Sequence, residues 1–504
     1  MNFNKLLFSF FNHRLKAIDR YANNAQEIQE NTLHALLSNA QSTEYGLKHG
    51  FKAIHSYSQF SSSVPVHTYE DLEPYFSRMH NGEQNILWHT PIRFFAKSSG
   101  TTNAKSKYIP VSQEALQQCH YRGGKDVVAL YSRINPNSRF FSGKGLILGG
   151  SHNGKKDPHH ILTGDLSAIL IENISPLINL IRVPSKKVAL MDEWESKIER
   201  IIDATCHANI TNLSGVPSWF LTLIKALLAR TGKNNLLEIW PNLEVFFHGG
   251  ISFTPYREEY LKLIPSDKMF YQETYNASEG FFGIQNDLSD PALLLMLDLG
   301  IFFEFIPLSE LEKGARRAVP LCDVELNKNY AIVITTNSGL WRYMIGDTII
   351  FTSKSPYKFI ISGRTKHFIN TFGEEVIVDN AEKALMKATQ QTGAIVKDYT
   401  AAPVYMSAKS KGRHQWLIEF IKQPDSIEQF AYILDQSLQE INSDYEAKRY
   451  KNLTLLPIEV IIARPNLFDD WLKQNGKLGG QHKIPRLSNS RTIIEQILAI
   501  NKTA

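Results

Sequence analysis

Apolar side chains recur at helical spacing in several segments of the chain. The clearest pattern covers residues 216–231, where it follows the i, i+3, i+4, i+7 rule. Pro217 stands at its start and Gly232 follows its last turn, and these residue types are favoured at those two positions. Further helices are predicted over residues 1 to about 45, 113–131 with a break at Gly123-Gly124, 379–391, and 426–441.

Short apolar runs between these helices predict buried strands, several of which end near a glycine. They cover residues 145–149, 243–247, 271–275, 330–336, 358–362 and 415–421. The segment from Ser56 to Pro91 is expected to be rich in loops, because Pro65, Pro74 and Pro91 interrupt it. Strands that alternate with helices are typical of an α/β fold.

Length and composition are those of an ordinary globular protein. The 504 residues allow more than one domain, and a composition with 43% hydrophobic and 21% charged residues is usual for a soluble chain. A shift in composition near Arg364 to Phe368 predicts a boundary between residues 1–366 and 367–504. The net charge of +5 is too small at this length to indicate a nucleic acid or an anionic membrane as partner. The oligomeric state cannot be read from the sequence.

Two features bear on the compartment. Cys119, Cys206 and Cys322 are far apart and odd in number, which argues against a disulfide framework and fits a reducing cytoplasm. The apolar run Leu6 to Phe11 is too short for a signal peptide and is followed at once by basic residues, so we interpret it as one face of a first helix. No run approaches the ~18 apolar residues that a membrane span needs.

The densest candidate chemistry lies between Ser98 and Pro110. Several hydroxyl side chains, one glycine and two lysines fall within ten positions. A backbone that bends at Gly100 can direct N–H groups toward one anion, and the lysines add positive charge, which suits a polyphosphate. The stretch is not a Walker-type phosphate loop, because no Gly-Lys-Ser/Thr follows. An ordinary polar turn between strands explains the same residues equally well.

Three later passages place glycines or carboxylates where predicted strands end. The first is His248-Gly249-Gly250, where two glycines let a flat ligand approach the backbone closely. The other two each carry a carboxylate, Glu279 in Tyr275–Gly280 and Asp347 in Arg342–Asp347. Such carboxylates hold Mg²⁺ or ribose hydroxyls in binding sites, and they satisfy turn amides elsewhere.

Taken in order, these motifs resemble the signatures of the acyl-adenylate-forming enzymes. They are Ser98-Ser99-Gly100-Thr101-Thr102, Tyr275-Asn276-Ala277-Ser278-Glu279-Gly280, Arg342-Tyr343-Met344-Ile345-Gly346-Asp347, and Gly363-Arg364-Thr365-Lys366. More closely, the chain resembles the auxin-responsive-promoter family of acyl acid amido synthetases, plant enzymes with bacterial relatives, over essentially its whole length. The resemblance implies a large N-terminal α/β adenylate-forming domain and a smaller, mobile C-terminal lid.

The resemblance also implies a two-step reaction. A carboxylic acid attacks the α-phosphorus of ATP and forms acyl-AMP and pyrophosphate. An amine, usually that of an amino acid, then attacks the acyl carbon, and AMP leaves. The cofactors implied are ATP and Mg²⁺, and the partners are a small carboxylic acid and an amino acid.

Roles carry over from the family position by position. The β- and γ-phosphates would be cradled by Ser98, Ser99, Gly100, Thr101 and Thr102. Tyr275 would stack on adenine, Gly249 and Gly250 would line the adenine slot, and Asp347 would bind both ribose hydroxyls. Ser278 would touch the α-phosphate, Glu279 would hold Mg²⁺, Arg364 and Lys366 would contact ribose or phosphate, and Lys483 matches the lid lysine that reaches the α-phosphate. Glu279 and Lys483 are therefore the candidate catalytic residues, with a solvated lysine as the alternative for Lys483.

Three positions depart from the family pattern. Asn103 stands where many of the phosphate loops have glycine, and His367 stands where the hinge often has aspartate. Ser278 replaces the usual threonine but keeps its hydroxyl.

The acyl end of the substrate has only loose candidates. Tyr121, Arg122 and Trp219 would line a pocket between the helices at 113–131 and 216–231. An arginine there would pair with the carboxylate of the acid.

Two other functions stay open on the sequence alone. An acyl-CoA synthetase forms the same acyl-adenylate before it makes a thioester, so the adenylation motifs do not separate it from an amido synthetase. A non-catalytic nucleotide-binding protein would carry the binding residues without turnover.

Overall fold

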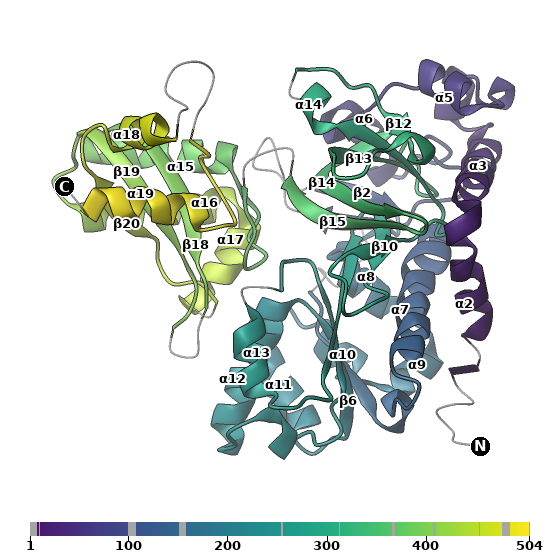
Figure 1. The fold of residues 1–504 in the computed structure, drawn as a ribbon, viewed down its shortest axis with the longest axis horizontal. Helices are drawn as coiled ribbons and strands as arrows, with labels where there is room; N and C mark the ends of the chain where they lie inside the picture. Colours follow the sequence, from purple (N-terminus) through teal and green to yellow (C-terminus); the bar gives the residue numbers. More distant parts are fainter. Residues whose placement is uncertain are drawn as a thin grey trace.

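The computed structural model describes residues 8–9, 11–98, 107–150, 158–253, 256–311, 313–364, 368–406, 410–452, 454–475 and 484–502. The chain forms a large N-terminal body and a smaller C-terminal lobe, drawn in light green and yellow in Figure 1. None of the helices in these parts of the chain is long and apolar enough to cross a membrane.

A mixed sheet organises the body. In spatial order, the strands that the structure describes in this sheet are β12 (Val319–Pro320), β11 (Ile301–Pro307), β13 (Asn329–Thr336), β14 (Tyr343–Lys354), β15 (Tyr357–Arg364), β10 (Leu293–Leu295), β9 (Gly280–Ile284), β8 (Phe270–Ala277), β7 (Val245–Gly249), β6 (Ile210–Gly215), β3 (Lys144–Ile147) and β5 (Arg182–Val183). The strands from β8 to β5 run parallel to one another, and those from β12 to β9 pair antiparallel. A second sheet has the order β2 (Lys107–Val111), β1 (Phe94–Ser98) and β4 (Leu162–Gly164).

Helices of the body surround these sheets (Figure 1). They are α2 (Asn12–Asp19), α3 (Tyr21–Ala40), α4 (Glu44–Lys48), α5 (Tyr57–Ser63), α6 (Tyr69–His80), α7 (Tyr121–Ile134), α8 (Leu166–Glu172), α9 (Pro176–Leu180), α10 (Lys186–Ala189), α11 (Trp194–Thr205), α12 (Pro217–Thr231), α13 (Arg257–Leu263) and α14 (Leu308–Leu311).

The two faces of the parallel strands bury two different cores. On β7, Phe247 packs against Tyr131 of α7, with 5.6 Å between ring centres. Its neighbour Phe246 packs against Phe220 of α12 at 5.1 Å. Because successive side chains of a strand point to opposite faces, α7 and α12 cover opposite faces of the sheet.

The C-terminal lobe is an α/β unit of its own. Its strands β18 (Ile395–Val404), β19 (Arg413–Lys422) and β20 (Glu459–Ala463) form a sheet, and a short pair, β16 (Phe368–Ile369) and β17 (Val376–Ile377), precedes it. Its helices are α15 (Val378–Thr392), α16 (Ile427–Ile441), α17 (Ser443–Arg449), α18 (Leu467–Gln474) and α19 (Thr492–Lys502). The predicted α/β fold class, with a large and a small domain, is confirmed.

The helix predictions with clear end signals are also confirmed. Helix α12 begins at Pro217, and Gly232 ends it in the left-handed conformation at φ +68°. Helix α16 begins after Ser426, whose side chain accepts a hydrogen bond from the N–H of Gln429.

Two predictions about breaks in the chain are wrong. The segment 56–91 contains α5 and α6, because Thr68 and Asp71 cap α6 reciprocally and the helix buries an apolar stripe despite Pro74. Helix α7 runs through Gly123-Gly124 without a break. A Cβ atom at Gly123 would lie 2.5 Å from the ring of Phe281, so this glycine allows close packing of the helix on the sheet.

Candidate active site

Two glycines, Gly249 and Gly250, lie at the edge of the sheet where β7 ends. Gly249 pairs with Thr274 of β8, and a Cβ atom at Gly249 would lie 2.3 Å from the carbonyl oxygen of Thr274. Gly250 follows with a left-handed φ of +82°, which disfavours any other residue. Gly249 therefore allows β7 and β8 to pack closely, and the exposed Gly250 leaves the carboxyl end of β7 accessible, at the edge where α/β sheets bind ligands.

The hairpin between β8 and β9 carries the candidate metal ligand. Ala277 pairs with Gly280, so Ser278 and Glu279 form the two-residue turn at its tip. The Glu279 side chain is half-buried. Oxygen donors of this kind suit Mg²⁺. The described residues contain no group of three or more His, Cys, Asp or Glu arranged to hold a metal. Glu279 therefore offers a carboxylate oxygen at the tip of this hairpin that suits Mg²⁺.

The structure brings the second and third sequence motifs together. The hydroxyl of Tyr275 on β8 donates a hydrogen bond to Oδ2 of Asp347 on β14. The Tyr275 ring is buried against Phe282, with 4.9 Å between ring centres. An aromatic ring and a carboxylate that meet in this way form one candidate site for a nucleoside.

Several predicted residues lie outside the described part of the chain. They are Ser99, Gly100, Thr101, Thr102, Lys366 and Lys483. Two others are described by their backbone alone. Ser98 ends β1 opposite Lys107, and Arg364 ends β15 opposite Asp347. The register therefore places the backbone of Arg364 beside the candidate ribose-binding carboxylate.

The three candidates for the acyl end are not brought together. The Tyr121 hydroxyl donates to the carbonyl oxygen of Leu170 at 2.7 Å, and Arg122 pairs with Asp298 at 3.1 Å. Both belong to α7, whereas Trp219 belongs to α12 on the opposite face of the sheet. The contacts of these three residues therefore do not join them, and the helices that carry them lie on different faces of the sheet.

The arginine of the third motif is a structural residue. Arg342 is buried, and its guanidinium pairs with Glu304 at 2.8 Å. Its Nη1 also donates to the carbonyl oxygens of Val64, at 2.6 Å, and Ser61. The Arg342 side chain thus ties the start of β14 to β11 and to the end of α5.

A cavity of about 310 Å³ lies on β7 and β8 just before these motifs, and sequence reasoning missed it. Its polar lining residues are His248, Arg257, Tyr271, Glu273 and Gln285. Nδ1 of His248 and the hydroxyl of Tyr271 are buried there without a hydrogen-bond partner among the described residues. The available signal was the pair Tyr271 and Glu273, two polar side chains that stand two positions apart and therefore on one face of the predicted strand.

Burial controls protonation in this cavity. It lowers the pKa of His248 to about 3, so this imidazole is neutral near pH 7. It raises the pKa of the Glu273 carboxyl from 4.5 to about 7, so this group gains a proton on folding between those two pH values.

Replacement of Glu273 by glutamine is expected to stabilise the protein progressively from pH 5 to pH 8. The native carboxyl resists ionisation, so the wild type loses stability as pH rises from the unfolded pKa to the folded pKa. The full gain is at most about 3 kcal/mol above pH 7, at about 1.4 kcal/mol for each pKa unit. Thermal unfolding across this pH range measures it, with Glu258→Gln as an exposed control on α13. A difference in Tm that does not change with pH would contradict it.

Comparison with solved structures identifies the class of fold. The chain shares its fold with an acyl acid amido synthetase, AtGH3.15 in complex with 2,4-DB, at a TM-score of 0.63 and 21% identity over 97% of this chain and 95% of that one. A 2-hydroxyisobutyryl-CoA ligase has the same fold at a TM-score of 0.59 and 13% identity, over 95% and 92% of the two chains. The fold is therefore that of the adenylate-forming enzymes.

The family follows from three matched domains. The GH3 family N-terminal domain matches residues 14–269, the GH3 family central domain matches residues 294–364, and the GH3 family C-terminal domain matches residues 379–492. These matches cover most of the chain, which belongs to the GH3 family. The predicted resemblance to acyl acid amido synthetases is confirmed.

Named relatives are similar along nearly their whole length. The indole-3-acetic acid-amido synthetase GH3.8 of Oryza sativa subsp. indica is 25% identical, over 96% of this chain and 91% of the relative. The 4-substituted benzoates-glutamate ligase GH3.12 of Arabidopsis thaliana is 23% identical, over 94% and 95%. Both names denote enzymes that join an acid to an amine-bearing partner.

Proposed function

We propose that this protein is an ATP-dependent acyl acid amido synthetase that joins a small carboxylic acid to an amino acid. The acid forms acyl-AMP and releases pyrophosphate. The amine nitrogen then bonds to the acyl carbon and loses a proton. The carbon–oxygen bond to AMP breaks, and AMP leaves with the electron pair. The hydrogen bond between Tyr275 and Asp347, beside the open end of β7, is the observation that carries the proposal.

The proposed roles follow the positions of the motifs. Tyr275 stacks on adenine, Gly249 and Gly250 line the adenine slot, and Asp347 holds both ribose hydroxyls. Ser278 touches the α-phosphate, and Glu279 would hold Mg²⁺ there. A bound Mg²⁺ would neutralise phosphate charge as the acid attacks. The loop from Ser98 to Thr102 cradles the β- and γ-phosphates, Arg364 and Lys366 contact ribose or phosphate, and Lys483 adds a cation at the α-phosphate.

Two further proposals concern the domain boundaries and the cellular compartment. Residues 1–366 form the adenylation domain, and residues 367–504 form a lid that moves between the two steps. The protein works in the cytoplasm, which agrees with its three free cysteines.

Exchange of labelled pyrophosphate into ATP, measured with a panel of carboxylic acids, tests the proposal. At least one acid is expected to support exchange that depends on Mg²⁺. Subsequent addition of mixed amino acids should give an amide product, whereas coenzyme A should give no thioester. A folded protein that catalyses no exchange with any acid would refute the proposal, and a thioester product would replace it with an acyl-CoA synthetase.

A further inference from the structure

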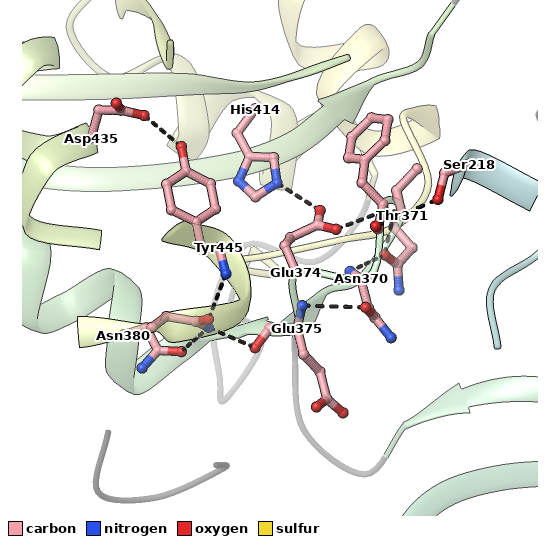
Figure 2. Close-up of polar contacts among 12 residues, drawn as sticks. Ser218, Asn370, Thr371, Glu374, Glu375, Asn380, His414, Asp435 and Tyr445 are labelled. Atoms are coloured by element: carbon pink, nitrogen blue, oxygen red, sulfur yellow. Dashed lines mark hydrogen bonds and ion pairs between the residues drawn. The ribbon is translucent and has the colours of Figure 1, made fainter. Parts of the chain in front are cut away.

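The turn from Asn370 to Glu375, at the start of the C-terminal lobe, contacts the body (Figure 2). The hydroxyl of Tyr256 donates to the carbonyl oxygen of Thr371 at 2.6 Å. Ser218, near the start of α12, donates to the carbonyl oxygen of Phe372 at 3.5 Å. The turn therefore lies against the first turn of α12.

Buried hydrogen bonds fix the shape of this turn. The Glu374 carboxylate accepts one bond from the N–H of Phe372 at 2.6 Å and contacts Nε2 of His414 at 2.7 Å (Figure 2). The side chains of Glu374 and His414 are fully buried. Gly373 precedes Glu374 in this turn and has a left-handed φ of +87°. A glycine adopts this conformation readily and places no side chain next to the body.

A lysine of the lobe reaches across to the body at this turn. Nζ of Lys448, on α17, lies 4.5 Å from the ring centre of Trp219 on α12. It would lie 3.8 Å from a Cβ atom at Gly373. Lys448 is half-buried, and no carboxylate among the described residues forms an ion pair with it. Burial also lowers the pKa of its amine.

Such a cation favours an anionic ligand. Removing an ammonium from water is costly unless an anion compensates it, and the Trp219 ring supplies only part of that compensation. The carboxylates that act on Lys448 from a distance are Asp444, Asp165 and Glu374. Glu374 is already engaged by His414 and the Phe372 amide.

The Lys448 ammonium also lies near the candidate active site. Helix α12 follows β6 directly, after Val216. A Cβ atom at Gly250 would lie 3.4 Å from Cγ2 of Val216. Trp219 and Lys448 therefore lie within one helical turn of the open ends of β6 and β7.

We propose that Lys448, which lies over the Trp219 ring beside Gly373, binds the α-carboxylate of the amino acid acceptor. This inference rests on the proposed function. The acceptor enters at the seam between lobe and body, with its carboxylate on Lys448 and its amine toward the end of β7. Gly373 presents only backbone beside Lys448, and the buried hydrogen bonds of Glu374 fix the shape of this turn.

The test compares acceptors with and without the carboxylate, using the full chain and an acid that supports pyrophosphate exchange. Amide formation is measured with the twenty amino acids and then with the best of them against its primary carboxamide. Wild type is expected to favour the free amino acid about 10- to 100-fold. Lys448→Ala should raise the KM for the amino acid by a similar factor and abolish the preference, and Lys448→Arg should restore part of it.

Lys451→Ala is the matched control. Lys451 pairs with Glu195 of the body at 2.6 Å, so its loss removes a lobe–body contact but not the proposed site. It should keep the preference for the free amino acid. Three outcomes overturn the inference: no preference in the wild type, an unchanged KM in Lys448→Ala, or an equal loss of exchange and amide formation in that variant. A lack of exchange with every acid would instead refute the proposed function.

Discussion

Replacement of Glu279 by glutamine is expected to reduce pyrophosphate exchange by about two to three orders of magnitude. The substitution keeps the shape of the side chain but removes the negative charge at the tip of the β8–β9 hairpin, where we propose that Mg²⁺ binds. Loss of one preorganised electrostatic group at a reacting phosphate has an effect of this size. Initial rates at saturating acid and varied Mg²⁺ measure the loss.

The matched control is Asp287→Asn, in the turn after β9. The Asp287 carboxylate accepts hydrogen bonds from the backbone and hydroxyl of Ser289, so it serves the turn itself. Its replacement should leave exchange within about twofold of the wild type, since it removes only a local turn contact. If Glu279→Gln retained a third or more of the wild-type rate, Glu279 would have no role at the metal.

Replacement of Arg342 by leucine is expected to destabilise the protein by about 3–5 kcal/mol. The change leaves the Glu304 carboxylate, which is 0% exposed, without its cation. It also leaves the carbonyl oxygens of Val64 and Ser61 without their donors. Urea unfolding, followed by tryptophan fluorescence, measures the loss.

Arg78→Ala provides the comparison at the surface. Arg78 also contacts two carboxylates, Glu44 and Glu83, each at 2.8 Å, but its side chain is 40% exposed. Water solvates both partners after the change, so the expected loss of stability is much smaller than that of Arg342→Leu. Equal losses in the two variants would show that burial of the Arg342 pair contributes nothing. The double variant Arg342→Leu, Glu304→Leu should recover part of the lost stability, because no buried charge is then left alone.

The sequence determined the features that depend on neighbouring residues. Helix α12 begins at Pro217 and ends before Gly232, and α16 begins after Ser426, because these signals act within one helical turn. The motifs identified the family because each of them is a short loop whose backbone requirements are visible in neighbouring residues. The break predicted at Gly123 was wrong, because this glycine serves to make room for the ring of Phe281, which is distant in the chain.

Only the tertiary structure decided which residues meet. Tyr275 and Asp347 are 72 positions apart, and their side chains meet although β9, β10 and β15 lie between β8 and β14 in the sheet. Arg342 ties the start of β14 to β11 because Glu304 faces it from that strand. Tyr121 and Trp219 lie on opposite faces because α7 and α12 cover different sides of the sheet. Lys448 contacts Trp219 only because the C-terminal lobe packs against the body. Strand order and crossover set these contacts, and they depend on the packing of the whole chain, which no local pattern contains.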